Sequence, residues 1–300
     1  MSEPGFKSGF VAIVGRPNVG KSTLLNRLVG RKVAITSAKP QTTRNRILGV
    51  ANQPDAQIVF IDTPGIHKPR HRLGEHMLRA VENALSEVEA VLFVVDASGG
   101  PPGAGDRAAA ERLARVAAPV ILVLNKVDAV KPGKVAELTQ AYGQLGRYHE
   151  VVPVSALFGH NVGRLVELLI GLLPEGPRYF PTDMVTDQPE RQLIAEFVRE
   201  QILHRTRDEV PHSVAVVVDE MRERPNGTLY ARATIYVERD SQKGILIGEG
   251  GQRLKAIGAA AREELERLLG THLFLELWVK VKKDWRDRPG ALQEFGFGEG

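Results

Sequence analysis

Residues 15–22 have the sequence GRPNVGKS, which matches the GxxxxGK[ST] pattern of a phosphate-binding loop. An apolar run, residues 10–14, precedes the loop, and a segment with helical periodicity follows it. A buried strand, a glycine-rich turn and a helix start together form an anion site from backbone N–H groups. Lys21 supplies a positive charge for the β- and γ-phosphates of a nucleotide, and the Ser22 hydroxyl can hold Mg²⁺. This context disfavours the alternative of a glycine-rich turn without function.

Three further motifs follow apolar runs and predict which nucleotide binds. The tetrapeptide DTPG carries Asp62, which can reach Mg²⁺ through water, and Gly65, whose backbone can approach a γ-phosphate. The tetrapeptide NKVD carries Asp128, whose carboxylate can accept two N–H groups that guanine has and adenine lacks. The tripeptide SAL at 155–157 can offer a backbone N–H to the guanine carbonyl. Each motif alone is weak, but the four motifs in this order predict GTP rather than ATP.

Composition and charge limit the classes of protein and partner. With 300 residues, 43% of them hydrophobic and 25% charged, the chain has the length of about two globular domains. It contains no cysteine, which excludes disulfides and thiolate metal sites. The sequence shows no signal peptide or long apolar stretch, so we expect a soluble protein. The net charge of +4 is a modest indication of a polyanionic partner.

Strand and helix patterns alternate from residue 9 to residue 173, as a parallel sheet with helices on both faces requires. The run 90–95 is entirely apolar, which is typical of a strand buried on both faces. Ligands of such folds bind beyond the carboxyl ends of the strands, where all four motifs lie. The expected strands are residues 10–14, 46–51, 57–61, 90–95, 120–124 and 151–154. The expected helices are residues 21–29, 72–86, 106–117, 133–146 and 163–172.

A change of pattern divides the chain into domains. Proline and glycine at 174–177 end the last helix of the first pattern, and Pro181 and Pro189 keep the next residues irregular. The expected parts are a GTP-binding domain at residues 1–173, a linker at 174–187 and a smaller α+β domain at 188–300. The elements expected in the last part are helix 190–206, strands 214–219 and 228–238, helix 241–247, a longer helix with core positions from 254 to 268, and strand 273–281.

Residues 248–251 (GEGG) match the GxxG loop of a KH domain, whose backbone clamps single-stranded RNA. A GxxG string alone is a weak signal, since glycine turns commonly start helices. The preceding tripeptide ILI, the following amphipathic helix and the element order α-β-β-α-α-β favour a KH domain of type II. An RNA strand would then lie in a groove between a helix and a sheet edge.

The charge of the C-terminal part is balanced, with 18 Lys and Arg residues against 20 Asp and Glu residues from residue 186 onward. Basic residues cluster near its end, where Trp278, Lys280 and Lys282 fall on one face of an alternating pattern. This face could contact phosphates and stack a base. The alternative is a solvated edge strand whose lysines oppose aggregation.

The phosphate loop, QTTR at 41–44, DTPG, NKVD and the C-terminal pattern together resemble the Era-type GTPases. The tract HLFLELWVKVKK at 272–283 is especially similar to that family. The resemblance covers nearly the whole chain and implies a bacterial GTPase that assists assembly of the 30S ribosomal subunit. It implies binding near the 3′ end of 16S rRNA in the GTP-bound state, with GTP or GDP and Mg²⁺ as cofactors. It further implies a cytoplasmic protein, with at most weak peripheral contact to the inner membrane and no obligate protein partner.

The resemblance also assigns residues of the nucleotide site. The expected nucleotide contacts are Gly15, Asn18, Val19, Gly20, Lys21, Ser22, Thr23, Asp62, Thr63, Pro64, Gly65, Asn125, Lys126, Asp128, Ser155 and Ala156. Ser22 and Thr43 are the expected Mg²⁺ ligands, with Asp62 acting through water, and Thr43 is favoured over Thr42. Asn18 matches a position that helps bind K⁺ in related GTPases, and the alternative is a tight-turn residue.

Ile66 follows DTPG where many GTPases place a glutamine that orients the attacking water. An isoleucine side chain cannot form a hydrogen bond, and Era-type proteins share this substitution, which implies slow intrinsic hydrolysis. We therefore assign no side chain as general base. The expected catalytic groups are Lys21, Thr43 and the backbone of Gly65. His67 and His71 lie nearby in the sequence, and we expect both to be inert.

One position of the RNA site departs from the family pattern. Era-type proteins often carry a basic residue inside the GxxG loop, whereas this chain has Glu249. A carboxylate that faces RNA phosphate weakens the contact, although Lys243, Arg253 and Lys255 flank the loop. The expected RNA contacts are Lys243, Ile247, Gly248, Glu249, Gly250, Gly251, Arg253, Lys255, Trp278, Lys280 and Lys282.

Two other functions stay open from the sequence alone. A P-loop ATPase or kinase with an accessory domain would require that Asp128 does not select guanine. A membrane-surface signalling or cell-cycle GTPase would use the basic C-terminal face. The sequence shows no long amphipathic anchor or lipidation signal in support of it.

Overall fold

The computed structural model describes residues 5–66 and 71–297, and the chain divides into two compact units. The N-terminal unit consists of residues 1–34, 43–68 and 77–187, and the C-terminal unit consists of residues 35–42, 69–76 and 188–300. Two short segments from the first half of the sequence therefore pack within the C-terminal unit. One of them ends directly before Thr43, and the other begins shortly after Gly65. Among the described residues, no helix has both the length and the apolar character needed to cross a membrane.

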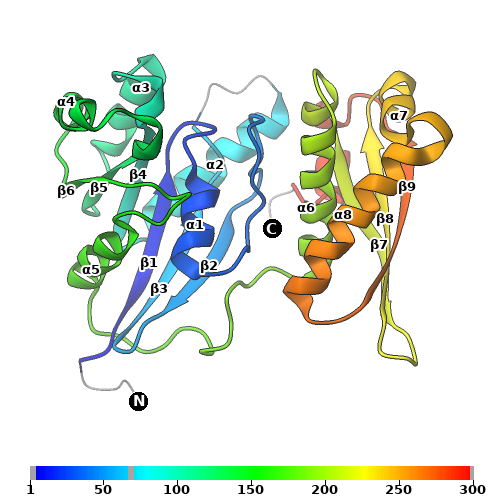
Figure 1. Cartoon of the computed structure of the whole chain (residues 1–300), viewed down its shortest axis with the longest axis horizontal. Coiled ribbons are helices and arrows are strands. Elements are labelled where there is room, and N and C mark those ends of the chain that lie inside the picture. Colours follow the sequence, from blue (N-terminus) through cyan, green and yellow to red (C-terminus); the bar gives the residue numbers. More distant parts are fainter. Residues whose placement is uncertain (1–4, 67–70, 298–300) are drawn as a thin grey trace. The chain divides into compact units, whose positions relative to one another are not determined.

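The N-terminal unit is built on a six-stranded sheet with the strand order β2-β3-β1-β4-β5-β6 (Figure 1). Strand β2 runs antiparallel to β3, and the other neighbouring strands are parallel. This arrangement confirms the predicted P-loop fold with a mostly parallel sheet. The elements up to residue 173 are β1 (Lys7–Val14), α1 (Lys21–Val29), β2 (Ile47–Asn52), β3 (Ala56–Asp62), α2 (Arg72–Ser86), β4 (Ala90–Asp96), α3 (Ala104–Leu113), β5 (Val120–Asn125), α4 (Pro132–Gly143), β6 (Glu150–Pro153) and α5 (Val162–Leu172).

Alternating side chains of β1 explain why helices cover both faces of this sheet. Val11 and Ile13 pack into one core with α1 and α5, whereas Ala12 and Val14 pack into a second core with α3 and α4. Strand β4 is buried along residues 90–95, as its apolar sequence predicts. The sheet therefore holds the carboxyl ends of β1, β3 and β5, which precede the predicted nucleotide motifs, on a rigid buried support.

Two helices of this unit end earlier than the sequence pattern predicts. Helix α3 ends at Leu113 rather than residue 117, and α4 ends at Gly143 rather than residue 146. The N–H of Val116 bonds to the carbonyl of Leu113, and similar bonds three residues apart follow α4. The chain thus continues as tight turns rather than as α-helix. These turns keep the apolar contacts that the sequence periodicity predicted.

The C-terminal unit contains a three-stranded sheet with the order β7-β8-β9, and α6, α7 and α8 cover one face of it (Figure 1). Strands β7 and β8 are antiparallel, whereas β8 and β9 are parallel, which confirms the predicted KH domain. Its core joins Phe197 and Ile202 of α6 to Ala233 of β8 and Ile257 of α8. The elements are α6 (Glu190–Arg205), β7 (Ala215–Glu223), β8 (Leu229–Val237), α7 (Asp240–Ile247), α8 (Gln252–Leu269), β9 (Leu273–Val281) and α9 (Pro289–Glu294).

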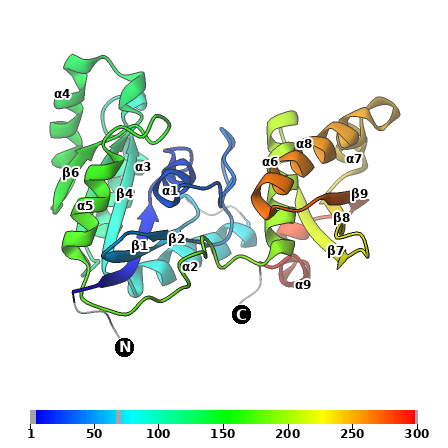
Figure 2. The ribbon, with the colours of Figure 1, turned by 60° about the horizontal axis from the view of Figure 1, so that its bottom comes forward.

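Helix α9 is an element that the sequence pattern did not predict (Figure 2). It has only six residues, which is too short for a periodic apolar signal. Aromatic packing holds it instead. Trp285, four residues before its start, is fully buried and donates from Nε1 to the carbonyl of Ser213 at 2.9 Å. Phe295, directly after it, packs on Tyr236 with the ring centroids 4.6 Å apart.

Candidate functional site

The phosphate loop depends on two glycines with positive φ angles. Gly15 has φ +153°, and a Cβ atom there would lie 2.2 Å from the carbonyl oxygen of Val94. Gly20 has φ +98°, and a Cβ atom there would lie 2.3 Å from Nδ2 of Asn125. Helix α1 begins at the next residue, so its first N–H groups face the concave side of the loop. The ends of β4 and β5 thus fix the loop that the sequence predicts.

Lys21 lies inside this loop and is 6% exposed. Its Nζ donates to the carbonyl oxygens of Gly15 at 3.3 Å and of Arg16 at 3.0 Å. Burial lowers the pKa of Lys21 to about 8, and the Asp62 carboxylate opposes that shift. The Lys21 ammonium is therefore hydrogen-bonded to carbonyl groups in a desolvated site, where an anionic phosphate would stabilise its charge.

Ser22, Thr43 and Asp62 bring their side-chain oxygens together. Ser22 Oγ donates to Asp62 Oδ2 at 2.6 Å and lies 3.0 Å from Thr43 Oγ1. Thr42 points elsewhere, because its Oγ1 donates to the carbonyl of Lys39 at 2.7 Å. Of these two threonines, Thr43 is the one whose hydroxyl lies beside Ser22, and its role as a Mg²⁺ ligand stays a prediction. The three oxygens converge as hard ligands for a divalent cation would.

Asp62 is fully buried, and its environment is unusual for an acid. Burial raises the pKa of Asp62 to about 6, while Lys21 and the hydrogen bonds from Ser22, Thr63 and Thr43 oppose that shift. Its Oδ1 is buried and has no hydrogen-bond partner among the described residues. A buried carboxylate oxygen without a partner is costly, so this atom is matched to a ligand that the protein itself does not supply.

Asn125 and Lys126 join the NKVD motif to the phosphate loop. Asn125 donates from Nδ2 to the carbonyl of Val19 at 2.8 Å and accepts at Oδ1 from the N–H of Ala156 at 3.0 Å. Lys126 donates to the carbonyl of Asn18 at 2.7 Å. Asp128, the predicted guanine acceptor, is exposed. Three predicted motifs thus meet along one edge, and the carboxylate of Asp128 is open to a ligand.

Ion pairs with two acidic residues, which were not predicted from the sequence, hold these motifs in place. Asp96, at the end of β4, accepts from Lys126 Nζ at 2.6 Å. Burial acts to raise the pKa of Asp96, but the hydrogen bonds from Lys126 and Ser98 outweigh burial and lower it. Asp106 is 1% exposed and accepts from Arg16 Nε, also at 2.6 Å. Position at the end of an apolar strand was a usable signal for Asp96, whereas nothing local in the sequence marks Asp106.

Several other residues of the predicted motifs, and the neighbouring Ile66, are buried and form hydrogen bonds within the protein. Thr63 is fully buried and donates from Oγ1 to the carbonyl of Ile13 at 2.8 Å. Ser155 is buried, and its Oγ accepts from the N–H of Phe158 at 3.2 Å. Ile66 is also buried, and its N–H bonds to the carbonyl of Gly15 at 3.0 Å. These residues shape the loops around the ligand through buried contacts. Val19 and Pro64 are buried, Thr23 is half-buried, and Asn18 is exposed with φ +64°.

Of the two histidines near DTPG, only His71 lies among the described residues. His71 Nδ1 lies 3.0 Å from Asp287 Oδ2, within the C-terminal unit. His67 lies outside the described residues. That His71 is inert stays a prediction.

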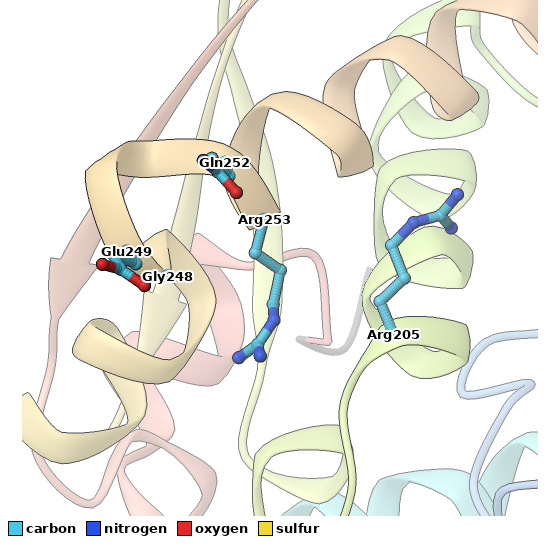
Figure 3. A pocket seen from close by; sticks show the side chains of 5 residues that line it. All are labelled: Arg205, Gly248, Glu249, Gln252 and Arg253. Atoms are coloured by element: carbon cyan, nitrogen blue, oxygen red, sulfur yellow. The ribbon is translucent and has the colours of Figure 1, made fainter.

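The GxxG loop lies between α7 and α8 and has an open backbone. Gly248 has φ +71° and ψ 176°, a conformation that only glycine adopts readily. Gly250 and Gly251 also have positive φ angles, and a Cβ atom at either would meet no other atom within 4 Å. Beside the loop is a hollow of about 440 Å³, lined by Arg205, Gly248, Glu249, Gln252 and Arg253 (Figure 3).

Two arginines from different helices line this hollow, and the side chain of Arg205 runs along α6, where its guanidinium donates to Gln201 (Figure 3). Arg253, in the first turn of α8, is exposed and donates to the carbonyl of Ile245. Arg205, the last residue of α6, was not predicted as a site residue, although it closes a predicted helix beside other basic positions. Glu249 is exposed on the loop itself. The hollow is therefore suited to an anion, with one carboxylate at its rim.

The remaining predicted RNA contacts lie outside this lining. Lys243 is half-buried and Lys255 is exposed, and Ile247 is half-buried at the end of α7. On β9, Trp278 is 54% exposed and donates from Nε1 to Glu276 at 2.7 Å. Lys280 is exposed on the same strand. Lys282 follows the end of β9 and pairs with Glu294 of α9, so it is not equivalent to the other two.

Two family models match separate parts of the chain. A family model described as 50S ribosome-binding GTPase matches residues 10–126, and one described as KH domain matches residues 209–286. A protein named GTPase Era from Heliobacterium modesticaldum is 55% identical over 293 residues, which are 98% of each chain. GTPase Era from Alkaliphilus metalliredigens is 50% identical and covers 97% of this chain and 99% of its own.

Solved structures of Era are similar over the same length. One is Era in complex with MgGDPNP and nucleotides 1506–1542 of 16S ribosomal RNA, with a TM-score of 0.94 and 45% identity. Another is an Aquifex aeolicus Era variant bound to GDP and AlF4⁻, with a TM-score of 0.92 and 45% identity. Each covers 98% of this chain and 100% of its own. The similarity extends across both units rather than the phosphate loop alone.

Proposed function

The chain belongs to the Era family of GTPases, and on this premise we propose that it binds small-subunit rRNA near its 3′ end and assists assembly of the 30S subunit in the cytoplasm. One observation carries the proposal. The four predicted nucleotide-binding motifs and an open GxxG loop occur in one chain that matches a solved Era–rRNA complex over 98% of its length. Neither site alone would support more than nucleotide binding or RNA binding.

We assign the nucleotide contacts from the geometry of the loop. Lys21 and the N-terminus of α1 bind the phosphates, because both present positive charge to the concave side of the loop. Asp128 accepts from the guanine edge, and Asn125 holds the loops on either side of the base. An adenine base would leave the Asp128 carboxylate without its two donors, which is the basis of guanine selection.

The residues present fit Mg²⁺. Ser22 Oγ and Thr43 Oγ1 are oxygen ligands of the type Mg²⁺ prefers, and the partnerless Asp62 Oδ1 is matched to a metal-bound water. When bound, Mg²⁺ neutralises phosphate charge that develops during phosphoryl transfer. Ser22 and Thr43 would hold the ion, and Asp62 would orient its water.

Hydrolysis proceeds without a side-chain general base. Ile66 is buried in the core and has no polar side-chain atom, so it cannot orient water. Lys21 stabilises negative charge on the phosphates, and the backbone of Gly65 binds the γ-phosphate. Asn18 helps hold K⁺, which adds positive charge beside the phosphates. This set of groups predicts slow intrinsic hydrolysis.

The C-terminal unit binds single-stranded RNA at the hollow beside the GxxG loop. The loop backbone approaches the strand closely because Gly250 and Gly251 have no side chains. Arg253 and Arg205 attract phosphates, and Lys243 and Lys255 add positive charge along the strand. Trp278 stacks a base, and Lys280 contacts a phosphate on β9.

Nucleotide-dependent RNA binding tests the proposal. Binding of a labelled single-stranded oligonucleotide from the 3′ end of small-subunit rRNA would be followed by fluorescence anisotropy, with GDP and with a non-hydrolysable GTP analogue. We expect tighter binding with the analogue. Gly248→Asp should abolish it, because the new side chain would meet Arg253 at 2.9 Å and place a carboxylate at the RNA.

Gly290→Asp is the matched control for that substitution. It adds the same charge to the C-terminal unit at a position where a Cβ atom meets nothing within 4 Å. It should leave RNA affinity within about twofold of the parent chain, since it lies outside the hollow. Equal RNA affinity with GDP and with the analogue would contradict the switched mechanism. Absence of RNA binding in both states would contradict the RNA assignment itself.

A further inference from the structure

The loop 155–160 carries the SAL motif, and hydrogen bonds hold most of it in place. Leu157 and Phe158 are 60% and 71% exposed, so these two large side chains do not anchor the loop in a core. At the base of the loop, the N–H of Ser155 bonds to the carbonyl of His160 at 3.2 Å. The part between these two residues therefore depends on polar contacts with neighbouring elements of the N-terminal unit.

Arg27, in the last turn of α1, makes two of these contacts. Its Nε donates to the carbonyl of Ala156 at 3.2 Å, and its Nη2 donates to the carbonyl of Leu157. The stem of its side chain lies beside Gly159, where an added Cβ atom would be 3.6 Å from Arg27 Cδ. One planar guanidinium thus binds two successive carbonyls of the loop 155–160 with charge-assisted hydrogen bonds.

These contacts set the orientation of the peptide group between Ala156 and Leu157. The described peptide bonds are trans, and in a trans peptide the C=O and the N–H point in opposite directions. Because the carbonyl of Ala156 faces Arg27, the N–H of Leu157 points away from Arg27. The N–H of Ala156 already donates to Asn125 Oδ1 at 3.0 Å. Within the part of the chain that the structure describes, the N–H of Leu157 donates to no protein group, so it is available to a ligand.

We propose that Arg27 is a positioning residue for guanine selection. It holds the N–H of Leu157 toward the 6-oxo group of the base, and this role rests on the guanine contact that the proposed function assigns to Asp128. Adenine carries an amino group at that position, so the fixed N–H would face a second donor. Helix α1 also begins at Lys21, so one rigid helix fixes the spacing between the phosphate loop and the loop 155–160. A donor oriented before binding costs less free energy to order.

Arg27→Met tests the proposal because it keeps an apolar stem beside Gly159 and removes every donor. Competition with a fluorescent guanine nucleotide would give dissociation constants for GDP and for 2-aminopurine riboside diphosphate. The latter lacks the 6-oxo group but keeps the 2-amino group that donates to Asp128. We expect Arg27→Met to weaken GDP about fivefold to tenfold, as loss of charge-assisted hydrogen bonds predicts, and the 2-aminopurine nucleotide by less than about twofold. Arg27→Lys retains a donor and should restore part of the affinity for GDP.

Arg31→Met is the matched control, since it makes the same change of side chain and charge. Arg31 lies shortly after the end of α1 and is exposed, and the donors to the carbonyls of Ala156 and Leu157 described above belong to Arg27. Arg31→Met should change neither dissociation constant by more than about twofold. The same selective loss for GDP in Arg31→Met would overturn the inference, because it would reflect net charge rather than the contacts of Arg27.

The nucleotide preference of the parent chain separates this inference from its premise. If the parent chain binds GDP no more tightly than the 2-aminopurine nucleotide, the proposed guanine site fails, and the inference fails with it. If the parent chain prefers GDP and Arg27→Met leaves that preference unchanged, only the positioning role is overturned. This holds whether Arg27→Met weakens both nucleotides equally or neither. A lower preference in Arg27→Met that partly returns in Arg27→Lys is the result that supports the role.

Discussion

The phosphate loop and the GxxG loop are both glycine-rich turns at the start of a helix, but their surroundings differ. In the phosphate loop, added Cβ atoms at Gly15 and Gly20 would collide with Val94 and Asn125. In the GxxG loop, Gly250 and Gly251 face open space, and only Gly248 has a close neighbour. The first loop is fixed by the ends of neighbouring strands, whereas the second is defined mainly by its own torsion angles.

The charges of the two loops differ in the same way. Lys21 and Asp62 are buried, and both have strongly shifted pKa values because of desolvation. Glu249 and Arg253 are exposed at the GxxG loop and lie in water. A buried, rigid loop suits a ligand of one fixed shape, such as a nucleotide diphosphate moiety. An exposed loop suits a flexible polyanion, and its electrostatics are screened by salt.

The largest expected effect comes from adding one methyl group to each loop. Gly20→Ala should weaken binding of GDP and of a GTP analogue at least about 100-fold, because the Cβ would displace Asn125 and strain the positive φ angle. Gly250→Ala should weaken RNA binding less than about threefold, since only the torsional preference changes. Fluorescent-nucleotide titration and RNA anisotropy measure the two effects.

If Gly20→Ala weakens nucleotide binding and Gly250→Ala weakens RNA binding to a similar extent, the two loops do not differ as described. Thermal unfolding with and without nucleotide serves as the control, since a folded Gly20→Ala protein should lose the stabilisation by GDP. A Gly250→Ala protein should retain it.

The second expected effect is a pH dependence that only the buried loop has. The pKa of Asp62 is raised to about 6, and a protonated carboxyl is a poor partner for Mg²⁺ or its water. Affinity for Mg²⁺–nucleotide should therefore fall as pH falls through 6, approaching tenfold per pH unit below it. Titrations between pH 5 and pH 7.5 measure this fall, and Asp62→Asn should leave only the pH dependence of the nucleotide itself.

The raised pKa of Asp62 also determines the direction in which the stability of the folded protein changes with pH. Because the folded pKa of about 6 exceeds the ordinary value of 3.8, the folded protein binds more protons than the unfolded chain between these values. Its stability without ligand should therefore fall as pH rises through this window. Asp62→Asn should remove that fall. If the stability difference between wild type and Asp62→Asn rises with pH over this window, the carboxyl is not desolvated as described.

The fold and most of the nucleotide site could be predicted from the sequence, because their signals are local. Strands such as 90–95 are continuous apolar runs, and the GTPase motifs keep fixed spacing around each strand end. The contacts that escaped prediction join distant residues. Glu200 binds Thr36 across 164 residues, and Arg16 binds Asp106 across 90. No periodicity or spacing reports such a pair, since either residue alone is an ordinary surface charge.

The smallest expected effect concerns Glu249, the acidic residue within the GxxG loop. Glu249 is exposed at the rim of the hollow, so Glu249→Lys should raise RNA affinity about threefold to tenfold at low salt. The salt dependence should steepen by roughly 0.7 in the log–log slope for each added phosphate contact. Anisotropy titrations from low to moderate salt measure both quantities, and Glu249→Gln should give an intermediate gain.

Glu167→Lys changes the net charge equally and is the control for that gain. Glu167 is 71% exposed on α5 of the N-terminal unit and does not line the hollow. It should alter RNA affinity by less than about twofold, because it does not line the hollow and salt screens the effect of a single exposed charge. An equal gain from Glu167→Lys would show that net charge, rather than the loop, governs RNA binding. Suppose that RNA affinity rises with Glu249→Lys but not with Glu167→Lys, and that nucleotide affinity stays unchanged. This result would show that the exposed loop tolerates a change in charge. The buried loop cannot tolerate one, because the charges of Lys21 and Asp62 are coupled there.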